Sequence, residues 1–104
     1  MKILVTGCAG FIGYHLSKSL LNNKKNKVFG IDNLNNYYDI KLKKNRLKSL
    51  KLNKNFIFNK IDISNKKKLK DNFSKNKYNV VVNLAAQAGV RYSIEKPEIY
   101  QKSN

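Results

Sequence analysis

The sequence has few of the residues on which secreted, zinc-binding and membrane-spanning proteins depend. It contains one cysteine, one histidine and one proline in 104 residues, so an internal disulfide is excluded and no zinc pattern is present. No apolar run approaches the ~20 residues that a membrane-spanning helix needs. The start of the chain meets a glycine too soon to form a secretory signal. We therefore expect a cytoplasmic protein with no membrane contact and no metal site.

Acidic residues are too few to balance the basic ones. Lysine and arginine number 22 against 6 acidic residues, which gives a formal net charge of +16. Such an excess attracts phosphate groups and makes nucleic acid a candidate partner. The basic residues are almost all lysines scattered among asparagines, a composition that AT-rich coding sequence also favours. No recognition-helix pattern and no interleaving of aromatics with arginines is present. Nucleic-acid binding is therefore an alternative and not the main prediction.

Short apolar runs alternate with helical patterns along the chain. The alternation predicts an α/β fold with a parallel sheet, and right-handed crossovers place helices on both of its faces. No internal repeat and no linker is present. The predicted strands cover residues 2–6, 27–32, 55–61 and 79–84, and the predicted helices cover residues 11–22, 40–52 and 66–76 and begin again within 95–104.

Apolar positions predict which face of each helix meets the sheet. The first helix carries Ile12, Leu16 and Leu20 at a spacing of four, and the third has only Leu69 and Phe73 facing inward. The second is a basic helix with apolar residues among its lysines. These residues are Ile40, Leu42, Leu47, Leu50 and Leu52.

Three glycines follow the first predicted strand and open the first predicted helix. Gly7 permits a tight turn, Gly10 lets the backbone approach a pyrophosphate, and Gly13 lets the helix pack close to the sheet. The start of the helix then presents free N–H groups to the phosphates. In this context the pattern predicts a dinucleotide-binding loop; a plain strand-to-helix turn is the alternative. Cys8, inside the loop, is interpreted as a small residue that fits the turn, although a helix N-terminus could lower its pKa.

Asp32 ends the second predicted strand, about twenty residues after the glycines. A carboxylate there accepts hydrogen bonds from the adenosine ribose and repels a 2′-phosphate, which favours NAD over NADP; a turn or cap is the alternative. Asp62 follows the third predicted strand. The residues alone favour the interpretation that it caps the next helix. Asn83 to Ala86 leave the fourth strand at the same sheet edge, where small side chains would let the backbone approach a flat ring; a tightly packed strand end is the alternative.

Three stretches resemble the extended short-chain dehydrogenase/reductase family, specifically its NAD-dependent sugar-nucleotide epimerases and dehydratases. They are VTGCAGFIGYHL, DNLNNYYDIKLKKNRL and NLAAQAGVRYSIEKPEIY. The first is common to the superfamily, whereas the other two are more specific. The resemblance implies a Rossmann-type three-layer sandwich with strand order 3-2-1-4, in which the fourth strand is an edge.

The resemblance also implies roles for individual residues. It assigns the pyrophosphate to Gly7, Gly10, Phe11, Ile12 and Gly13; the ribose to Asp32 and Asn33; the adenine to Asp62 and Ile63; the nicotinamide side to Leu84, Ala85, Ala86 and Gln87; the sugar nucleotide to Val90 and Arg91; and a further cofactor contact to Asn104. The implied cofactor is NAD and the implied substrate is a UDP-sugar.

In this family the catalytic Ser/Thr, the Tyr-x-x-x-Lys pair and the substrate domain follow a further strand. We therefore expect residues 1–104 to be the N-terminal part of the NAD-binding domain, without catalytic residues or the C-terminal half of the enzyme. The intact enzyme is expected to be a homodimer. Three chance matches to Tyr-x-x-x-Lys receive no catalytic role, and the first is expected to point away from the core. They are Tyr14/Lys18, Tyr37/Lys41 and Tyr92/Lys96.

Other functions remain open. One is another NAD-dependent epimerase or dehydratase of the same family. The others are a non-catalytic NAD-binding module and the basic nucleic-acid binder considered above.

Overall fold

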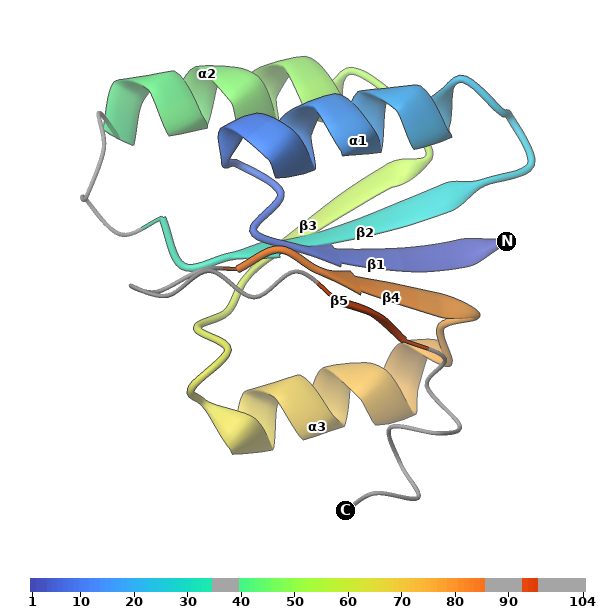
Figure 1. The fold of residues 1–104 in the computed structure, drawn as a ribbon, viewed down its shortest axis with the longest axis vertical. Helices are drawn as coiled ribbons and strands as arrows, with labels where there is room; N and C mark the ends of the chain where they lie inside the picture. The colour runs from blue at the N-terminus through green and yellow to red at the C-terminus, as the bar shows by residue number, and fades with distance from the viewer. Residues whose placement is uncertain (35–39, 86–92, 96–104) are drawn as a thin grey trace.

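The computed structural model describes residues 1–34, 40–85 and 93–95. In these ranges strands and helices alternate as the sequence predicts (Figure 1). The strands are β1 (Lys2–Thr6), β2 (Lys27–Asp32), β3 (Phe56–Lys60), β4 (Val80–Asn83) and β5 (Ser93–Glu95); the helices are α1 (Phe11–Leu21), α2 (Ile40–Lys51) and α3 (Lys66–Asn76).

The strands form one sheet in the order β3-β2-β1-β4-β5. The first four are parallel, which confirms the predicted order 3-2-1-4. β5 runs antiparallel to β4 and pairs Val82 with Ile94. The prediction that β4 is an unpaired edge is therefore wrong, as is the predicted helix at Glu95; residues 96–104 lie outside the described ranges. An unpaired strand edge favours the addition of another strand, and a three-residue segment is too short to show its period in the sequence.

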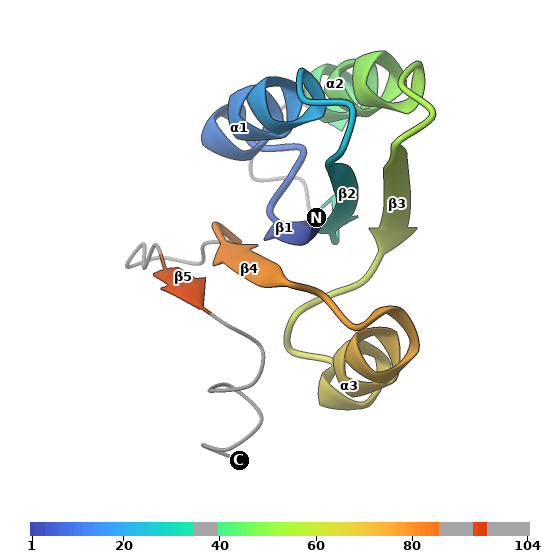
Figure 2. The ribbon, with the colours of Figure 1, turned by 90° about the vertical axis from the view of Figure 1, so that its right-hand side faces the viewer.

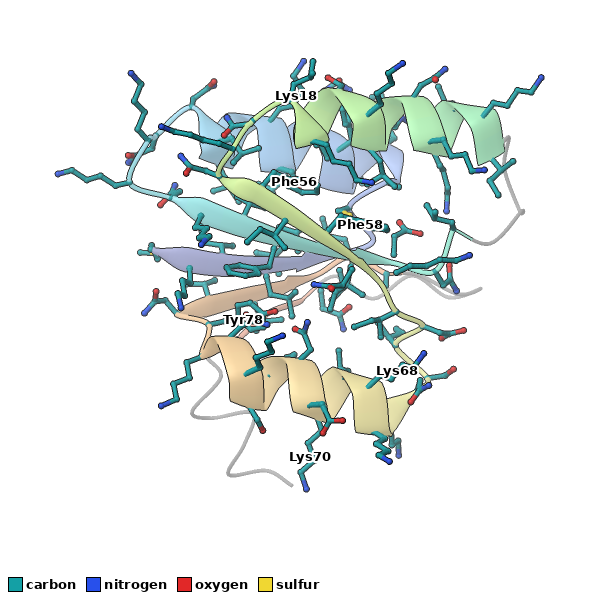
Figure 3. The ribbon with its side chains drawn as sticks, turned by 180° about the vertical axis from the view of Figure 1, so that it is seen from behind. Lys18, Phe56, Phe58, Lys68, Lys70 and Tyr78 are labelled. Carbon is teal, nitrogen blue, oxygen red and sulfur yellow. The ribbon has the colours of Figure 1, made fainter. Side chains whose placement is uncertain are left out.

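The helices cover both faces of the sheet, as the crossover rule predicts. Figure 2 shows α1 and α2 side by side on one face and α3 on the other. Each layer encloses its own part of the core. Phe56 and Phe58 lie on the face toward α1 and α2, whereas Tyr78 lies between the sheet and α3 (Figure 3). No helix in the described ranges is long and apolar enough to cross a membrane.

The buried face of α1 differs from the predicted one. Ile12 is 49% exposed, and the buried positions of the helix are Gly13, Ser17 and Leu21. Leu16 and Leu20 are only partly buried against the core. The small residues at 13 and 17 let the helix approach the backbone beneath it, and this close approach outweighs the burial of Ile12.

The inward stripe of α2 consists of Lys43, Leu47 and Leu50. Ile40 and Leu42 are exposed, and Leu52 lies beyond the helix end with an exposure of 85%. In α3 the prediction is confirmed for Leu69 and Phe73, which pack against the core, but they are not the only inward residues. Asn72 is buried beside them and accepts a hydrogen bond from the Tyr78 hydroxyl, which the sequence did not indicate.

Candidate functional site

The first glycine of the loop is held between two strands. Gly7 has a φ of +74°, a left-handed conformation that favours glycine. Its N–H donates to the Ile31 carbonyl at the end of β2 (2.7 Å). A Cβ at Gly7 would lie 2.8 Å from the Ala85 nitrogen, beyond the end of β4. The loop therefore touches both neighbours of β1, and a side chain at Gly7 would separate it from them.

The second and third glycines have different surroundings. A Cβ at Gly13 would overlap the carbonyl oxygen of Gly7, so the third glycine allows α1 to pack on the loop. Among the residues that the structure describes, a Cβ at Gly10 would meet only the Gly7 oxygen, at 3.3 Å. Within that part of the chain the space above Gly10 is therefore free for a ligand that approaches the backbone.

The N-terminus of α1 beside Gly10 lacks a side-chain cap. No side chain of the described residues caps the helix, and its first turn contains no acidic residue. Phe11 and Ile12 are 66% and 49% exposed. The first N–H groups of a helix have no partner within it and carry partial positive charge. The combination of this helix end with the open space at Gly10 suits a phosphate group.

Asp32 lies beside the glycine loop, as the sequence predicts. Its side chain is 5% exposed. Oδ2 accepts from the Ala9 N–H (3.0 Å), and Oδ1 accepts from the Leu34 N–H (2.8 Å). The contact with Leu34 is the turn that the alternative interpretation of Asp32 predicts. The contact with Ala9 instead joins the end of β2 directly to the loop.

Two basic residues of α2 reach the same place and were missed by the sequence analysis. The Lys43 ammonium lies 3.6 Å from Asp32 Oδ1, and Lys43 is 8% exposed. The Arg46 guanidinium donates to the Ala9 carbonyl (3.1 Å) and lies 5.9 Å from the centre of the Phe11 ring. One feature of the sequence could have indicated Lys43. It lies four residues before Leu47, which lies three residues before Leu50, so the three share one face of the helix.

Thr6 connects the end of β1 to the end of β4. Its hydroxyl donates to Asn83 Oδ1 and accepts the N–H groups of Leu84 (3.0 Å) and Ala85 (3.2 Å). Thr6 is 3% exposed. These bonds fix the backbone where the sequence predicts a close approach to a flat ring. No sequence pattern indicated Thr6, since its partners lie far along the chain.

Asp62 and Ile63 follow β3 at the same edge of the sheet. Asp62 is exposed, and its Oδ1 accepts from the N–H and the hydroxyl of Ser64 (2.9 and 2.8 Å). The Ser64 hydrogen bonds, with a smaller contribution from the Asn33 side chain, lower the pKa of Asp62. The helix cap is Asn65, which accepts from Lys68 N–H, so the prediction that Asp62 caps α3 is wrong. The link to Asn33 instead joins the segments that follow β2 and β3.

Cys8 lies under the loop and is fully buried. Burial, with a smaller effect of the Asp32 carboxylate, raises the pKa of its thiol. Full burial supports the interpretation of Cys8 as a small residue that fits the turn, and the raised pKa is the opposite of what a helix end would produce.

Tyr14 does not point away from the core as expected. It packs against the core, and its hydroxyl donates to Ser49 Oγ of α2 (3.2 Å). The reason is that α2 lies alongside α1, so this flank of the helix is partly covered. Lys18 does share its face, since its Nζ lies 5.4 Å from the centre of the Tyr14 ring.

Several predicted positions lie outside the described ranges. Within those ranges no three His, Cys, Asp or Glu side chains could hold a metal ion together. The positions outside are Ala86, Gln87, Val90, Arg91 and Asn104 of the implied site, and Tyr37, Tyr92 and Lys96 of the chance matches.

The chain is similar to known proteins over almost all of its length. The sequence model of the GDP-mannose 4,6 dehydratase family matches residues 4–104. Protein CapI of Staphylococcus aureus is 53% identical over 104 residues, all of this chain and 30% of CapI. UDP-glucuronate 4-epimerase of Thermodesulfobacterium geofontis is 50% identical over 101 residues, 97% of this chain and 31% of that protein.

A solved structure is also similar. UDP-glucuronic acid 4-epimerase from Bacillus cereus, in complex with UDP-glucuronic acid and NAD, superposes with a TM-score of 0.71 at 46% identity, over 88% of this chain and 28% of that one. The chain thus spans about 30% of the length of the curated relatives it matches.

Proposed function

Since this chain belongs to the NAD-dependent epimerase/dehydratase family, we propose that it is the N-terminal, NAD-binding part of a sugar-nucleotide 4-epimerase, most similar to UDP-glucuronate 4-epimerase. The observation that carries the proposal is the open backbone at Gly10 beside the uncapped end of α1. The similarity to a B. cereus epimerase that holds NAD and UDP-glucuronic acid supports it.

The described residues fit a dinucleotide at the carboxyl edge of the sheet. Gly7, Gly10 and Gly13, with the N–H groups of Phe11 and Ile12, would hold the pyrophosphate. Asp32 and Asn33 would hold the adenosine ribose, Asp62 and Ile63 would flank the adenine, and Leu84 and Ala85 would lie toward the nicotinamide. When bound, NAD would take a hydride from the sugar and return it.

The chain's own contribution is to bind and orient. Thr6 fixes the backbone at Leu84 and Ala85, and Asp32 is fixed against the glycine loop through Ala9. We assign the acid/base pair of the reaction to no residue of this chain. We therefore expect residues 1–104 alone to bind NAD and to leave UDP-glucuronate unchanged.

The test is NAD binding by calorimetry to the chain and to Gly10→Ala. The backbone at Gly10 (φ −71°, ψ 168°) accepts alanine, so the free energy of unfolding should change by about 1 kcal/mol or less. The added methyl occupies the space where the pyrophosphate approaches, and NAD affinity should fall at least about tenfold. Ser19→Ala, at an exposed position of α1, is the matched control and should bind as the parent does. Equal affinity of the Gly10→Ala variant and the parent would refute the proposed site.

A second measurement addresses the reaction. The chain is incubated with NAD and UDP-glucuronate, and the sugar nucleotides are separated by chromatography. No epimer is expected. Turnover would show that the acid/base pair lies within this chain, contrary to the proposal.

A further inference from the structure

Lys43 is buried although the other lysines of its helix are exposed. It is 8% exposed, whereas Lys41, Lys44, Lys48 and Lys51 all lie at exposed positions of α2. Lysine is almost never fully buried unless it is paired. Its partner is Asp32, which is 5% exposed and ends β2. The helix thus directs one ammonium inward to the residue expected to contact the ribose.

Among the described residues, two hydrogen-bond donors and one ammonium group contact the Asp32 carboxylate. The N–H groups of Ala9 and Leu34 bind one oxygen each, and the Lys43 ammonium lies 3.6 Å from Oδ1. An ionised carboxylate offers about four lone-pair positions, so one further donor can be accommodated. A ribose hydroxyl would meet a carboxylate whose charge is balanced by Lys43. A 2′-phosphate would meet the same carboxylate together with that ammonium.

Arg46 adds a second cation beside this pair. It lies three residues after Lys43, donates to the Ala9 carbonyl, and so borders the same loop residue that donates to Asp32. Asp32, Lys43 and Arg46 together carry a net charge of +1. Asp32 is the anion of this group, and its charge is what opposes a phosphate at the 2′ position.

We propose that Lys43 helps to set specificity at the adenosine 2′ position: Asp32 opposes a 2′-phosphate and Lys43 partly offsets that opposition, so the preference for NAD over NADP is set by the Asp32–Lys43 pair and not by Asp32 alone. The inference rests on the proposed function, because it requires a dinucleotide at this site. While Asp32 is ionised, it holds Lys43 and repels a 2′-phosphate. When the charge of Asp32 is removed, Lys43 is released and becomes an anchor for that phosphate.

The test compares NAD and NADP binding by calorimetry in the 104-residue chain. Asp32→Asn removes the charge at nearly constant shape, and NADP affinity should rise at least about tenfold because Lys43 becomes available. Adding Lys43→Gln should abolish that gain. Adding Lys48→Gln instead, an exposed lysine of the same helix, should preserve it and controls for the loss of one positive charge.

The outcomes separate this proposal from the proposed function. If the parent chain binds neither nucleotide, both fail. Suppose that the parent chain binds NAD. The role of Lys43 is refuted, and the NAD site stands, if the rise in NADP affinity caused by Asp32→Asn persists when Lys43→Gln is added. The same holds if Lys48→Gln abolishes that rise equally. If the Asp32→Asn chain fails to fold, the single variant Lys43→Gln provides the test of the proposal. It should lower NADP affinity relative to NAD at least about threefold, since Asp32 then lacks its counter-charge, and an unchanged ratio would overturn the proposal.

Discussion

The hydroxyl of Thr6 lies 3.2 Å from the backbone nitrogen of Ala85, although 79 residues separate them. The same hydroxyl accepts the Leu84 N–H and donates to Asn83. This side chain therefore adds to the β1–β4 strand pairing and to the backbone bond from the Leu84 N–H to the Thr6 carbonyl (3.1 Å). It helps to set the spacing between the glycine loop after β1 and the segment after β4.

Thr6→Val should lower the free energy of unfolding by about 1–3 kcal/mol, because a partly buried N–H and the Asn83 amide oxygen lose their partner. Valine keeps the size and shape of the side chain. Urea unfolding at neutral pH measures the change. Thr6→Ser, which keeps the hydroxyl and loses only the methyl group, should lose less stability than Thr6→Val; a loss in Thr6→Ser as large as that in Thr6→Val would show that the hydroxyl contributes no more than the methyl group.

Gly13→Ala should destabilise the fold by about 2 kcal/mol or more, because the new Cβ overlaps backbone atoms that cannot move independently of the loop. The expectation contrasts with Gly10→Ala, which should alter binding more than stability. Thermal unfolding followed by circular dichroism distinguishes the two variants. A Gly13→Ala chain as stable as the parent would show that α1 can move away from the loop without cost.

Tyr78 should make stability depend on pH in the alkaline range. Burial raises the pKa of Tyr78 to about 12, whereas tyrosine in an unfolded chain titrates near 10. Between these values the native chain keeps a proton that the unfolded chain has released, so the free energy of unfolding falls as the pH rises from about 10 to 12. This contribution is fully present below pH 10.

Tyr78→Phe isolates that contribution from the titration of the lysines. Urea unfolding across this pH range should show a steeper decline in the parent than in the variant. Below pH 10 the variant should be less stable, because Asn72 loses its hydrogen-bond donor. Parallel declines in the two proteins would contradict the assignment to Tyr78.

Ending the chain at residue 92 should promote aggregation. It removes β5 and exposes the edge of β4, where Val80, Val81 and Val82 follow one another. Light scattering over time at a fixed concentration measures the effect. A chain ended at residue 95 keeps the paired strand and should scatter as the parent does. Similar behaviour of the two shortened chains would mean that β5 does not protect the edge.

The sequence predicts the four parallel strands because each is a short apolar run bounded by polar residues, and the family resemblance implies their order. It does not predict β5, since three residues show no period and the pairing depends on a neighbouring edge. The sequence predicts the wrong buried face of α1, because Ile12 is apolar and Gly13 and Ser17 are not. Close packing against the loop and the sheet buries the two small residues and leaves Ile12 exposed.

The residues of the candidate site were likewise predicted only in part. The glycines and Asp32 were found because a local spacing marks them. Lys43 and Thr6 were missed, because a lysine on a basic helix resembles a solvated residue and a threonine at a strand end belongs to no pattern. Both act through partners from other elements, which only the folded arrangement brings near.

The position of β1 between β2 and β4 also constrains when the chain can fold during synthesis. β1 is made first, yet its second neighbour and the partners of Thr6 come 77–79 residues later. At about 5–20 residues per second, a ribosome needs roughly 4–16 s to cover that distance. For that interval the strand with the apolar row Ile3, Leu4 and Val5 has one unpaired edge, so the nascent chain exposes a strand edge that other chains could pair with.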